Sequence, residues 1–374
     1  MRRTLTSFLL LVALLFGYDK TLACTAAVVA PKASKEGGTT LWKNRDSSRF
    51  RTVVRYYTTD KYNYTGVINS ENPDGGILCG VNEVGFGIIN TATRNLPANK
   101  ELKGTGKRSP FMRDALIQCA TIDEFEAFLR KYKRGYKFTT NIGVGDANGG
   151  AAFFEIWGDG YRRYDVDKSE KGYDIRSNFS FAGDMERLGT SRRRYDAMME
   201  QIGNKRKFSA KDFYKYSCSY YVAGKGDALK DDNKLYNHRY ETVPHRSTVG
   251  SFTIVCGKHP RILISMGYPA ACPAIPVWVE AKEQIPECLS GTASHLLGRK
   301  FVKAAYIKDG VIKSRGKKKG RYYLNKELVR AALRVKTNIP FPEEMPKDIA
   351  KFNQKADKAY KKHERRVESL LTRF

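Results

Sequence analysis

Short apolar runs that pair across turn residues occupy much of the first two thirds of the chain. The runs are rich in β-branched residues, as expected for strands. Three pairs of runs predict β-hairpins, with turns at Gly37-Gly38, at Asn82 to Gly85 and at Asn148 to Gly150. Further strands are expected at 252–255 and 262–266. The pattern therefore predicts antiparallel sheets.

Apolar residues at helical spacing interrupt or follow these strands. They predict helices within 109–132, at Thr190–Ile202 and at 349–370. The first segment is expected to hold two helices, because Thr121 and Glu124 form a capping box in its middle. Sheets of hairpins that are covered by helices predict an α+β layered domain.

A longer apolar run, 7–17, lies near the N-terminus and follows two arginines. Thr21 and Ala23 supply the small residues that a signal peptidase reads, so residues 1–23 are predicted to be a signal peptide. No later run approaches the roughly 18 apolar residues of a membrane-spanning helix. We therefore expect an exported, periplasmic or extracellular protein whose mature chain is soluble and begins at Cys24.

The formal net charge of the chain is strongly positive, at +28. Residues 299–374 hold 23 basic and 8 acidic residues, and we expect them to form a basic, largely helical extension that packs on a domain of residues 24–298. No zinc-finger, RNP or basic-zipper pattern is present, so nucleic-acid binding is not expected. The charge favours contact with anionic envelope surfaces or acidic substrates.

The histidines and cysteines show no metal-ligand spacing. The five histidines are scattered and no two cysteines form a CxxC pair, so neither a metal nor another cofactor is expected. The chain has seven cysteines, an odd number. If Cys24 is set apart, the other six could form disulfides or remain buried thiols, and no pairing is predicted.

Cleavage after Ala23 would give Cys24 a free α-amine beside its thiol. An α-amine has an ordinary pKa of about 7.7–8.0, so near neutral pH it can accept the thiol proton without a histidine. This is the arrangement of an N-terminal-nucleophile hydrolase. A lipid anchor and a structural cysteine stay open as alternatives, although Thr21 stands where a lipidation signal usually has Leu, Val or Ile.

The first hairpin predicts which side chains lie near Cys24. The far ends of two antiparallel strands face each other, so Lys43, Arg45 and Asp46 are expected beside the cysteine. Asp46 could hold the α-amine, and a basic neighbour could favour the thiolate and bind substrate.

At these residues the chain resembles a known family. A processed Cys-Thr N-terminus, followed by a strand that ends in Lys-Asn-Arg-Asp, is similar to the N-terminal-nucleophile hydrolases of linear amide C–N bonds. The resemblance is to the acyl-coenzyme A:6-aminopenicillanate acyltransferase family, which is related to choloylglycine hydrolase and penicillin V acylase. It covers roughly Cys24 to Pro276 and implies a four-layer αββα sandwich of two antiparallel sheets between helices.

The resemblance also implies roles for site residues. Asp46 corresponds to the family's carboxylate, and the family's arginine falls on Lys43 or on Arg45, depending on which residue is aligned. Asn90, which follows the Asn-Glu-Val-Gly turn, and Asn178 match the asparagines that stabilise the oxyanion.

A run of three arginines opens the helix predicted at Thr190–Ile202. Arg192 is the best match to the family's site arginine and is expected to point into the site, where it would hold Asp46 or the nucleophile. Arg193 and Arg194 are expected to face solvent.

The function implied is that of an exported cysteine amidohydrolase acting on an N-acyl amino acid, a conjugated bile acid or a penicillin-like amide. An acyltransferase would use the same catalytic residues, and a non-catalytic envelope protein would use Cys24 as a lipid anchor, so both stay open. A serine-hydrolase triad with His245 is not expected, because no Gly-x-Ser-x-Gly motif accompanies it.

Overall fold

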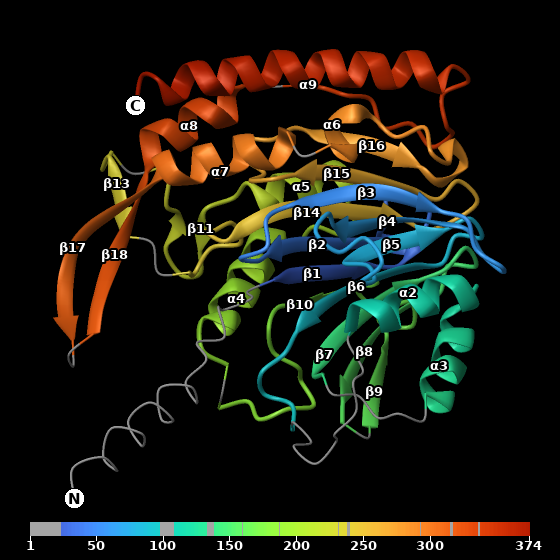
Figure 1. Cartoon of the computed structure of the whole chain (residues 1–374). Helices are drawn as coiled ribbons and strands as arrows, with labels where there is room; N and C mark the ends of the chain where they lie inside the picture. The colour runs from blue at the N-terminus through green and yellow to red at the C-terminus, as the bar shows by residue number, and fades with distance from the viewer. Residues whose placement is uncertain are drawn as a thin grey trace, which may run out of the picture.

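Two large antiparallel sheets and the helices that cover them form the main body of the computed structural model of the chain (Figure 1). It describes residues 24–374 apart from 98–107, 133–137, 159, 187, 231, 238–239, 292, 315–316 and 336. The signal peptide predicted for residues 1–23 lies outside the described residues.

The first sheet has six strands in the order β10-β1-β2-β14-β15-β16. The strands are β1 (Thr25–Val29), β2 (Thr40–Asp46), β10 (Tyr173–Arg176), β14 (Thr248–Val255), β15 (Arg261–Met266) and β16 (Ala274–Trp278). β1 and β2 form the hairpin predicted around Gly37-Gly38, with a short 3-10 helix, η1 (Pro31–Ala33), in the connection. Because Thr25 pairs with Asn44, the far ends of the hairpin meet as expected.

The second sheet has seven strands in sequence order. The strands are β3 (Thr52–Tyr57), β4 (Tyr64–Asn69), β5 (Cys79–Asn82), β6 (Gly87–Ala92), β7 (Thr140–Gly145), β8 (Ala151–Trp157) and β9 (Gly160–Asp165). The predicted turn between β5 and β6 is confirmed, and Gly85 has a φ of +85°, a left-handed conformation that glycine adopts without strain. The hairpin of β7 and β8 is also confirmed.

The two sheets pack face to face around the main hydrophobic core. It includes Val28, Leu41 and Ile254 from the first sheet and Val81, Ile89 and Phe153 from the second, all fully buried. The contact is close, because a Cβ atom added at Gly143 would lie 2.8 Å from Cγ2 of Val28 in the facing sheet. Apolar burial of this kind is the main favourable term in folding.

Helices cover the outer faces of both sheets. Helices α2 (Arg108–Gln118) and α3 (Ile122–Lys131) pack on the second sheet, where Phe111 and Phe125 meet Phe154. Helices α4 (Thr190–Ile202) and α5 (Ala210–Ser217) pack on the first, where Met198 and Phe213 meet Trp42. The layers run helix, sheet, sheet, helix, which confirms the predicted αββα sandwich (Figure 1).

The C-terminal part adds helices on the side of β15 and β16, and a hairpin, β17 and β18, that projects away from the sandwich (Figure 1). They are η2 (Val279–Ala281), α6 (Glu287–Ser290), α7 (Ala293–Ala305), β17 (Tyr306–Ser314), β18 (Lys317–Asn325), α8 (Lys326–Arg334) and α9 (Ile349–Leu371). β18 also pairs with β13 (Leu235–Asn237), and β11 (Tyr221–Val222) pairs with β12 (Gly226–Asp227).

The boundary predicted after residue 298 falls inside α7, and the segment 299–374, expected to be largely helical, also contains the hairpin of β17 and β18. Helix α9 packs on the main core through Ala356, Tyr360 and Val367, as expected from its apolar spacing. Among the described residues, no helix has both the length and the apolar character needed to cross a membrane.

Candidate active site

The hairpin of β1 and β2 places Cys24 at one end of the sandwich, just before β1. Side chains alternate between the faces of a strand, so Cys24 shares a face with Ala26, which lies in the core between the sheets. The thiol is buried, with 7% of the residue exposed, and Sγ lies 3.9 Å from the backbone oxygen of Asp46. The structure thus brings Cys24 and Asp46 together, as the hairpin predicted.

Lys43 lies on the same interior face and reaches across to the second sheet. Its Nζ donates to Oδ1 of Asn90 at 2.7 Å and to the backbone oxygen of Leu78 at 2.9 Å. Burial lowers the pKa of Lys43 to about 8, an effect that a thiolate at Cys24 would oppose. Lys43 is therefore a buried cation within electrostatic reach of the thiol.

Arg45 is a second buried cation near Cys24. Its guanidinium donates to the backbone oxygen of Arg49 at 2.9 Å and to Oδ1 of Asn69 at 3.1 Å. Burial lowers its pKa to about 10, and the charge of Cys24 opposes this effect too. Of the two residues that the sequence left open, Lys43 is the one that contacts Asn90.

Asn90 lies on β6, opposite Ile142 of β7. Because an ammonium group only donates hydrogen bonds, the contact with Lys43 fixes the Asn90 oxygen towards the cation and turns the NH2 group away. That nitrogen makes one long bond, of 3.4 Å, to the Thr140 hydroxyl. The other N–H has no acceptor among the described residues, so it can donate to a ligand.

Asn178 follows β10 and is held in the same way. Its Oδ1 accepts from Nη2 of Arg194 at 2.9 Å, and its Nδ2 donates to the backbone oxygen of Ala92 at 2.7 Å. Ala92 is the last residue of β6, two positions after Asn90. The two asparagines predicted for the oxyanion therefore lie at the same end of the sandwich, each with its carbonyl oxygen held by a cation.

The expectations for the arginines of α4 need correction. The Arg192 side chain is 49% exposed and pairs with Asp196 at 2.7 Å, so it does not reach into the site. Arg194, expected to face solvent, is fully buried. Burial lowers the pKa of Arg194, while the charges of Asp46 and Cys24 raise it. Arg193 pairs with Glu241 and is largely exposed, as expected.

Asp46 lies in a buried polar cage. Its Oδ1 accepts from the Thr248 hydroxyl at 2.5 Å and from Nδ2 of Asn44 at 3.3 Å, and its Oδ2 lies 3.1 Å from Nε2 of His245. Oδ2 has no well-aligned hydrogen bond, which is unusual for a buried carboxylate oxygen. The free acceptor is where an additional donor, such as an α-amine at Cys24, would be satisfied.

His245 also approaches Ser247, whose hydroxyl lies 3.0 Å from Nδ1. Ser247, His245 and Asp46 therefore form a series of contacts, although the sequence did not favour a triad. The order on the ring is the reverse of the serine-protease arrangement, in which the serine meets Nε2 and the carboxylate meets Nδ1.

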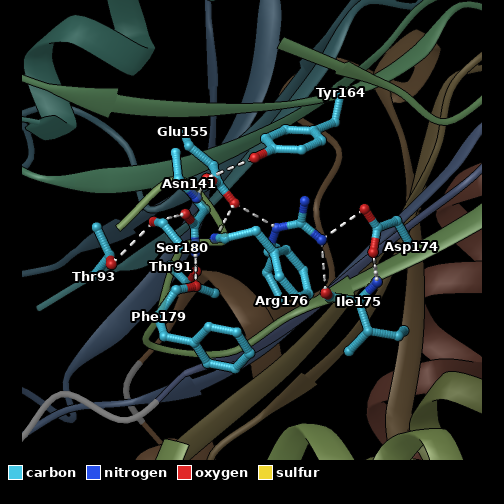
Figure 2. A network of polar contacts seen from close by, with 12 residues as sticks. Thr91, Thr93, Asn141, Glu155, Tyr164, Asp174, Ile175, Arg176, Phe179 and Ser180 are labelled. Atoms are coloured by element: carbon cyan, nitrogen blue, oxygen red, sulfur yellow. Dashed lines mark hydrogen bonds and ion pairs between the residues drawn. The ribbon is translucent and has the colours of Figure 1, made fainter. Parts of the chain in front are cut away.

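A buried network holds the segment that carries Asn178, and Figure 2 shows it. Glu155 of β8 pairs with Nε of Arg176 on β10 at 3.0 Å and accepts from the backbone N–H groups of Phe181 and Ala182 at 2.8 Å each. Nδ2 of Asn141 donates to the backbone oxygens that flank Asn178, those of residues 177 and 179.

Both Glu155 and Asn141 were missed at the sequence level. The available signal was a lone polar residue in an otherwise apolar strand, since Glu155 stands in the run Ala-Ala-Phe-Phe-Glu-Ile-Trp. A buried polar side chain needs hydrogen-bond partners. For Glu155 these are the Arg176 guanidinium and two backbone N–H groups of the loop after β10.

The remaining cysteines do not compete with Cys24 as nucleophiles. All seven are free. Burial raises the pKa of Cys79, Cys119 and Cys218 to about 12 each, so these thiols stay protonated near neutral pH. Within the described part of the chain, no group of three or more His, Cys, Asp or Glu side chains could hold a metal ion.

Comparison with protein-family models and with curated proteins finds no match. Among solved structures, the chain is similar to an N-acylethanolamine-hydrolyzing acid amidase ortholog from Caenorhabditis elegans, with 17% identity, 62% of this chain and 92% of that chain covered, and a TM-score of 0.41. It is also similar to penicillin V acylase from Agrobacterium tumefaciens, with 15% identity, coverage of 68% and 85%, and a TM-score of 0.41.

A third similar structure is that of a mutant conjugated bile acid hydrolase from Clostridium perfringens, with 14% identity, coverage of 71% and 94%, and a TM-score of 0.43. All three are linear amide hydrolases of the kind that the motifs resemble. Likenesses this distant do not carry a function, which has to rest on the site itself.

Proposed function

We propose that this protein is an N-terminal-nucleophile amidohydrolase that cleaves linear amide bonds, with Cys24 as the first residue of the mature chain and its nucleophile. One observation carries the proposal: beside the buried thiol, two buried asparagines are each oriented by a buried cation. Lys43 holds Oδ1 of Asn90, and Arg194 holds Oδ1 of Asn178. Donors fixed in advance are what an oxyanion site requires.

The reaction follows from this geometry. The Cys24 sulfur attacks the amide carbonyl carbon, a C–S bond forms, and the carbonyl electron pair moves onto oxygen, where Asn90 and Asn178 would each donate one N–H. The α-amine of Cys24 takes the thiol proton and passes it to the leaving nitrogen as the C–N bond breaks. Water then attacks the thioester, gives a proton to the α-amine, and releases the acid; the proton returns to the sulfur.

Asp46 would hold the α-amine in place. Its Oδ2 lacks an aligned hydrogen bond in the uncut chain, and Thr248 and His245 fix the orientation of the carboxylate. Removal of residues 1–23 would create the missing donor. We therefore propose that one cleavage both accompanies export and unmasks the catalytic base.

Mass spectrometry of the mature N-terminus tests this processing step. An unmodified chain that begins at Cys24 supports the proposal. A diacylglyceryl group on Cys24 would instead identify a lipid-anchored protein whose cysteine is no nucleophile.

Ser247 is a second candidate nucleophile, because its hydroxyl contacts His245, which in turn contacts Asp46. This alternative lacks the feature that favours Cys24, since among the described residues no hydrogen bond links Ser247 to either of the oriented donors, Asn90 and Asn178. It predicts a serine hydrolase that does not need the mature N-terminus.

Hydrolysis of bile-acid conjugates, penicillin V and N-acyl amino acids by the purified protein tests both candidates. Cys24→Ser should lower turnover by at least about a thousandfold without unfolding the protein, because it removes the attacking thiolate. Ser247→Ala is the matched control and should keep activity within about a factor of three. The opposite pattern would replace the cysteine mechanism by the serine one.

An acyltransferase would share all the residues described so far. Addition of a free amine acceptor to the assay separates the two reactions, because a hydrolase releases the acid while a transferase forms the new amide. Hydrolysis and acyl transfer differ only in which nucleophile, water or amine, reaches the thioester.

A further inference from the structure

Arg108 is a cation beside the site that the proposed mechanism does not use. It is the first residue of α2, and the backbone oxygen of the next residue, Ser109, accepts from the N–H of Ile77 at 3.1 Å. The residue after Ile77 is Leu78, whose oxygen accepts from Nζ of Lys43 at 2.9 Å. The start of α2 is therefore anchored next to Lys43, on the side of the site that faces the second sheet.

Arg108 differs from the other site cations because no described residue accepts a hydrogen bond from it. Its Nε is buried and has no partner. Lys43, Arg45 and Arg194, in contrast, each donate to an asparagine side chain. Burial lowers the pKa of Arg108, and the charge of Cys24 is what opposes this effect. The residue as a whole is partly exposed, but a buried N–H without an acceptor is costly unless a ligand supplies one.

The charges around the thiol are also unbalanced. Lys43, Arg45 and Arg108 lie towards the second sheet, while the nearby carboxylate, Asp46, is enclosed by Thr248 and His245. A ligand that enters beside Cys24 therefore meets positive charge. A planar guanidinium binds a carboxylate with two parallel hydrogen bonds, which makes an anionic group the natural acceptor for Arg108.

The position of the charge selects one half of the substrate. In an amide of an α-amino acid, only the nitrogen and Cα separate the attacked carbonyl carbon from the carboxylate, so the two carbons lie within about 4 Å of each other. The carboxylate must then lie close to the Cys24 sulfur, on the side where the start of α2 lies next to Lys43 and where Arg108 is within electrostatic reach of that sulfur. We propose that Arg108 binds a carboxylate on the amine half of the substrate, so that the enzyme prefers amides of amino acids to amides of neutral amines.

This inference rests on the proposed function, but its first test needs no substrate. Iodoacetate and iodoacetamide alkylate thiols, have nearly the same shape and differ in charge. The rates at which each labels Cys24 in the processed protein are measured by peptide mass spectrometry. The quantity compared is the ratio of the iodoacetate rate to the iodoacetamide rate. In the unsubstituted protein we expect this ratio to be higher than in a free cysteine peptide.

Arg108→Gln should lower this rate ratio by roughly three- to tenfold, because it removes one nearby positive charge. Arg108→Lys, which keeps the charge, should retain most of the ratio. The matched control is Arg113→Gln on the same helix, since Arg113 pairs with its neighbour Asp114 and with the backbone oxygen of Asp74. A ratio that is unchanged in Arg108→Gln, or that falls equally in Arg113→Gln, would overturn the inference.

The second test uses substrates in pairs, an N-acylglycine and the corresponding N-acylglycinamide with the same acyl group. Arg108→Gln should raise KM for the glycine conjugate by roughly ten- to a hundredfold and leave the glycinamide unaffected, because only the first offers a charged acceptor. The split between the two substrates identifies a binding role, since a structural defect would slow both alike.

The outcomes separate the inference from the proposed function. Equal cleavage of both substrates by the unsubstituted protein would refute the amine-side carboxylate and leave the amidase intact. A preference for a charged acyl group, such as a glutaryl amide, would assign Arg108 to the other half of the substrate and also refute the inference. A processed Cys24 that reacts with neither alkylating reagent would contradict the proposed function itself.

Discussion

At the scale of single residues, the site depends on cations that fix neutral donors. Lys43 does for Asn90 what Arg194 does for Asn178, but the two cations differ in how firmly they hold their charge. A guanidinium stays protonated across the physiological range, whereas a buried ammonium gives up its proton more readily. The pKa of Lys43, lowered by burial from 10.5 to about 8, brings the loss of its charge into the working range.

The rate should therefore fall on the alkaline side as Lys43 loses its proton. We expect kcat/KM to rise with pH as the α-amine becomes a free base, and to decline above about pH 8 as the Lys43 cation disappears. Lys43→Arg should move the decline to higher pH by at least about one unit, because arginine stays charged. Lys61→Arg at the surface is the control. A decline at the same pH in Lys43→Arg would show that another group causes it.

Stability should respond to the same proton. The pKa of Lys43 is about 8 in the folded protein, and its ordinary value, expected for the unfolded chain, is 10.5. Between these two pH values the unfolded chain therefore binds more protons than the folded one. The contribution of Lys43 to the free energy of unfolding therefore increases as pH rises through this window, and the cost of burying its charge is fully present below pH 8.

Site residues on strands were easier to predict than the arginine on a helix. Lys43, Arg45 and Asp46 follow from the two-residue period of a hairpin and from its antiparallel register. Adjacent helical residues point about 100° apart, so the choice among three consecutive arginines depends on the buried face. Arg194 shares its face with Ser191, Ala197 and Met198, at helical spacing, and this spacing was the overlooked signal.

At the scale of elements, the loop after β10 is held by the opposite sheet. Arg176 and Glu155 are both fully buried, and the Arg176 guanidinium lies over the rings of Phe153, Tyr164 and Phe181. The pair therefore joins the two sheets at the point where the chain leaves β10 for Asn178. Its role is to position that asparagine rather than to react.

Glu155→Gln should destabilise the protein strongly, because it removes the one fully buried carboxylate that pairs with Arg176 and leaves only the partly exposed Asp174. We expect a loss of about 3–5 kcal/mol in the free energy of unfolding, measured by urea denaturation. Glu126→Gln is the matched control, since Glu126 pairs with Arg163 and Arg130 near the surface, and should cost at most about 1 kcal/mol. Similar losses in both variants would mean that the buried pair contributes no more to the free energy of unfolding than a pair near the surface does.

Sequence patterns indicated the local elements better than their long-range pairings. The hairpins could be predicted because their strands are neighbours in sequence, and Gly85 marks a turn. The strands of the C-terminal hairpin lie in the basic segment that the sequence predicts to be largely helical, and a lysine-rich run such as 317–321 offers no alternating apolar pattern from which a strand could be predicted. The contact between Glu155 and Arg176 spans two sheets, and nothing local predicts it.

At the scale of the whole molecule, the fold follows from the pairing of strands and the packing of apolar faces. The net charge of +28 is not explained by either. Helix α9 carries the clearest example. Its inner face is buried through Ala356, Tyr360 and Val367, while its lysines and arginines lie on the exposed side. Packing explains the inner face. On the outer face Lys361 pairs with Glu287 at 3.7 Å, and the other exposed basic residues are the ones that we propose contact anionic envelope surfaces.

Binding of the protein to vesicles tests that contact. We expect the protein to sediment with vesicles that contain anionic lipids and not with neutral ones, and to be released by about 0.5 M salt, because the attraction is screened. Replacement of four exposed basic residues of α9 with glutamine should weaken the binding at least about tenfold, since each contributes up to about 1 kcal/mol near an anionic surface. The residues are Lys355, Lys358, Lys362 and Arg366.

The matched control replaces four exposed basic residues near α5, and so removes the same net charge from a different place. These are Arg206, Lys207, Lys211 and Lys215. If α9 is the contact surface, the control should lose much less binding than the α9 variant. Equal losses would mean that net charge alone attracts the protein, and binding that ignores both salt and lipid charge would contradict an electrostatic contact altogether.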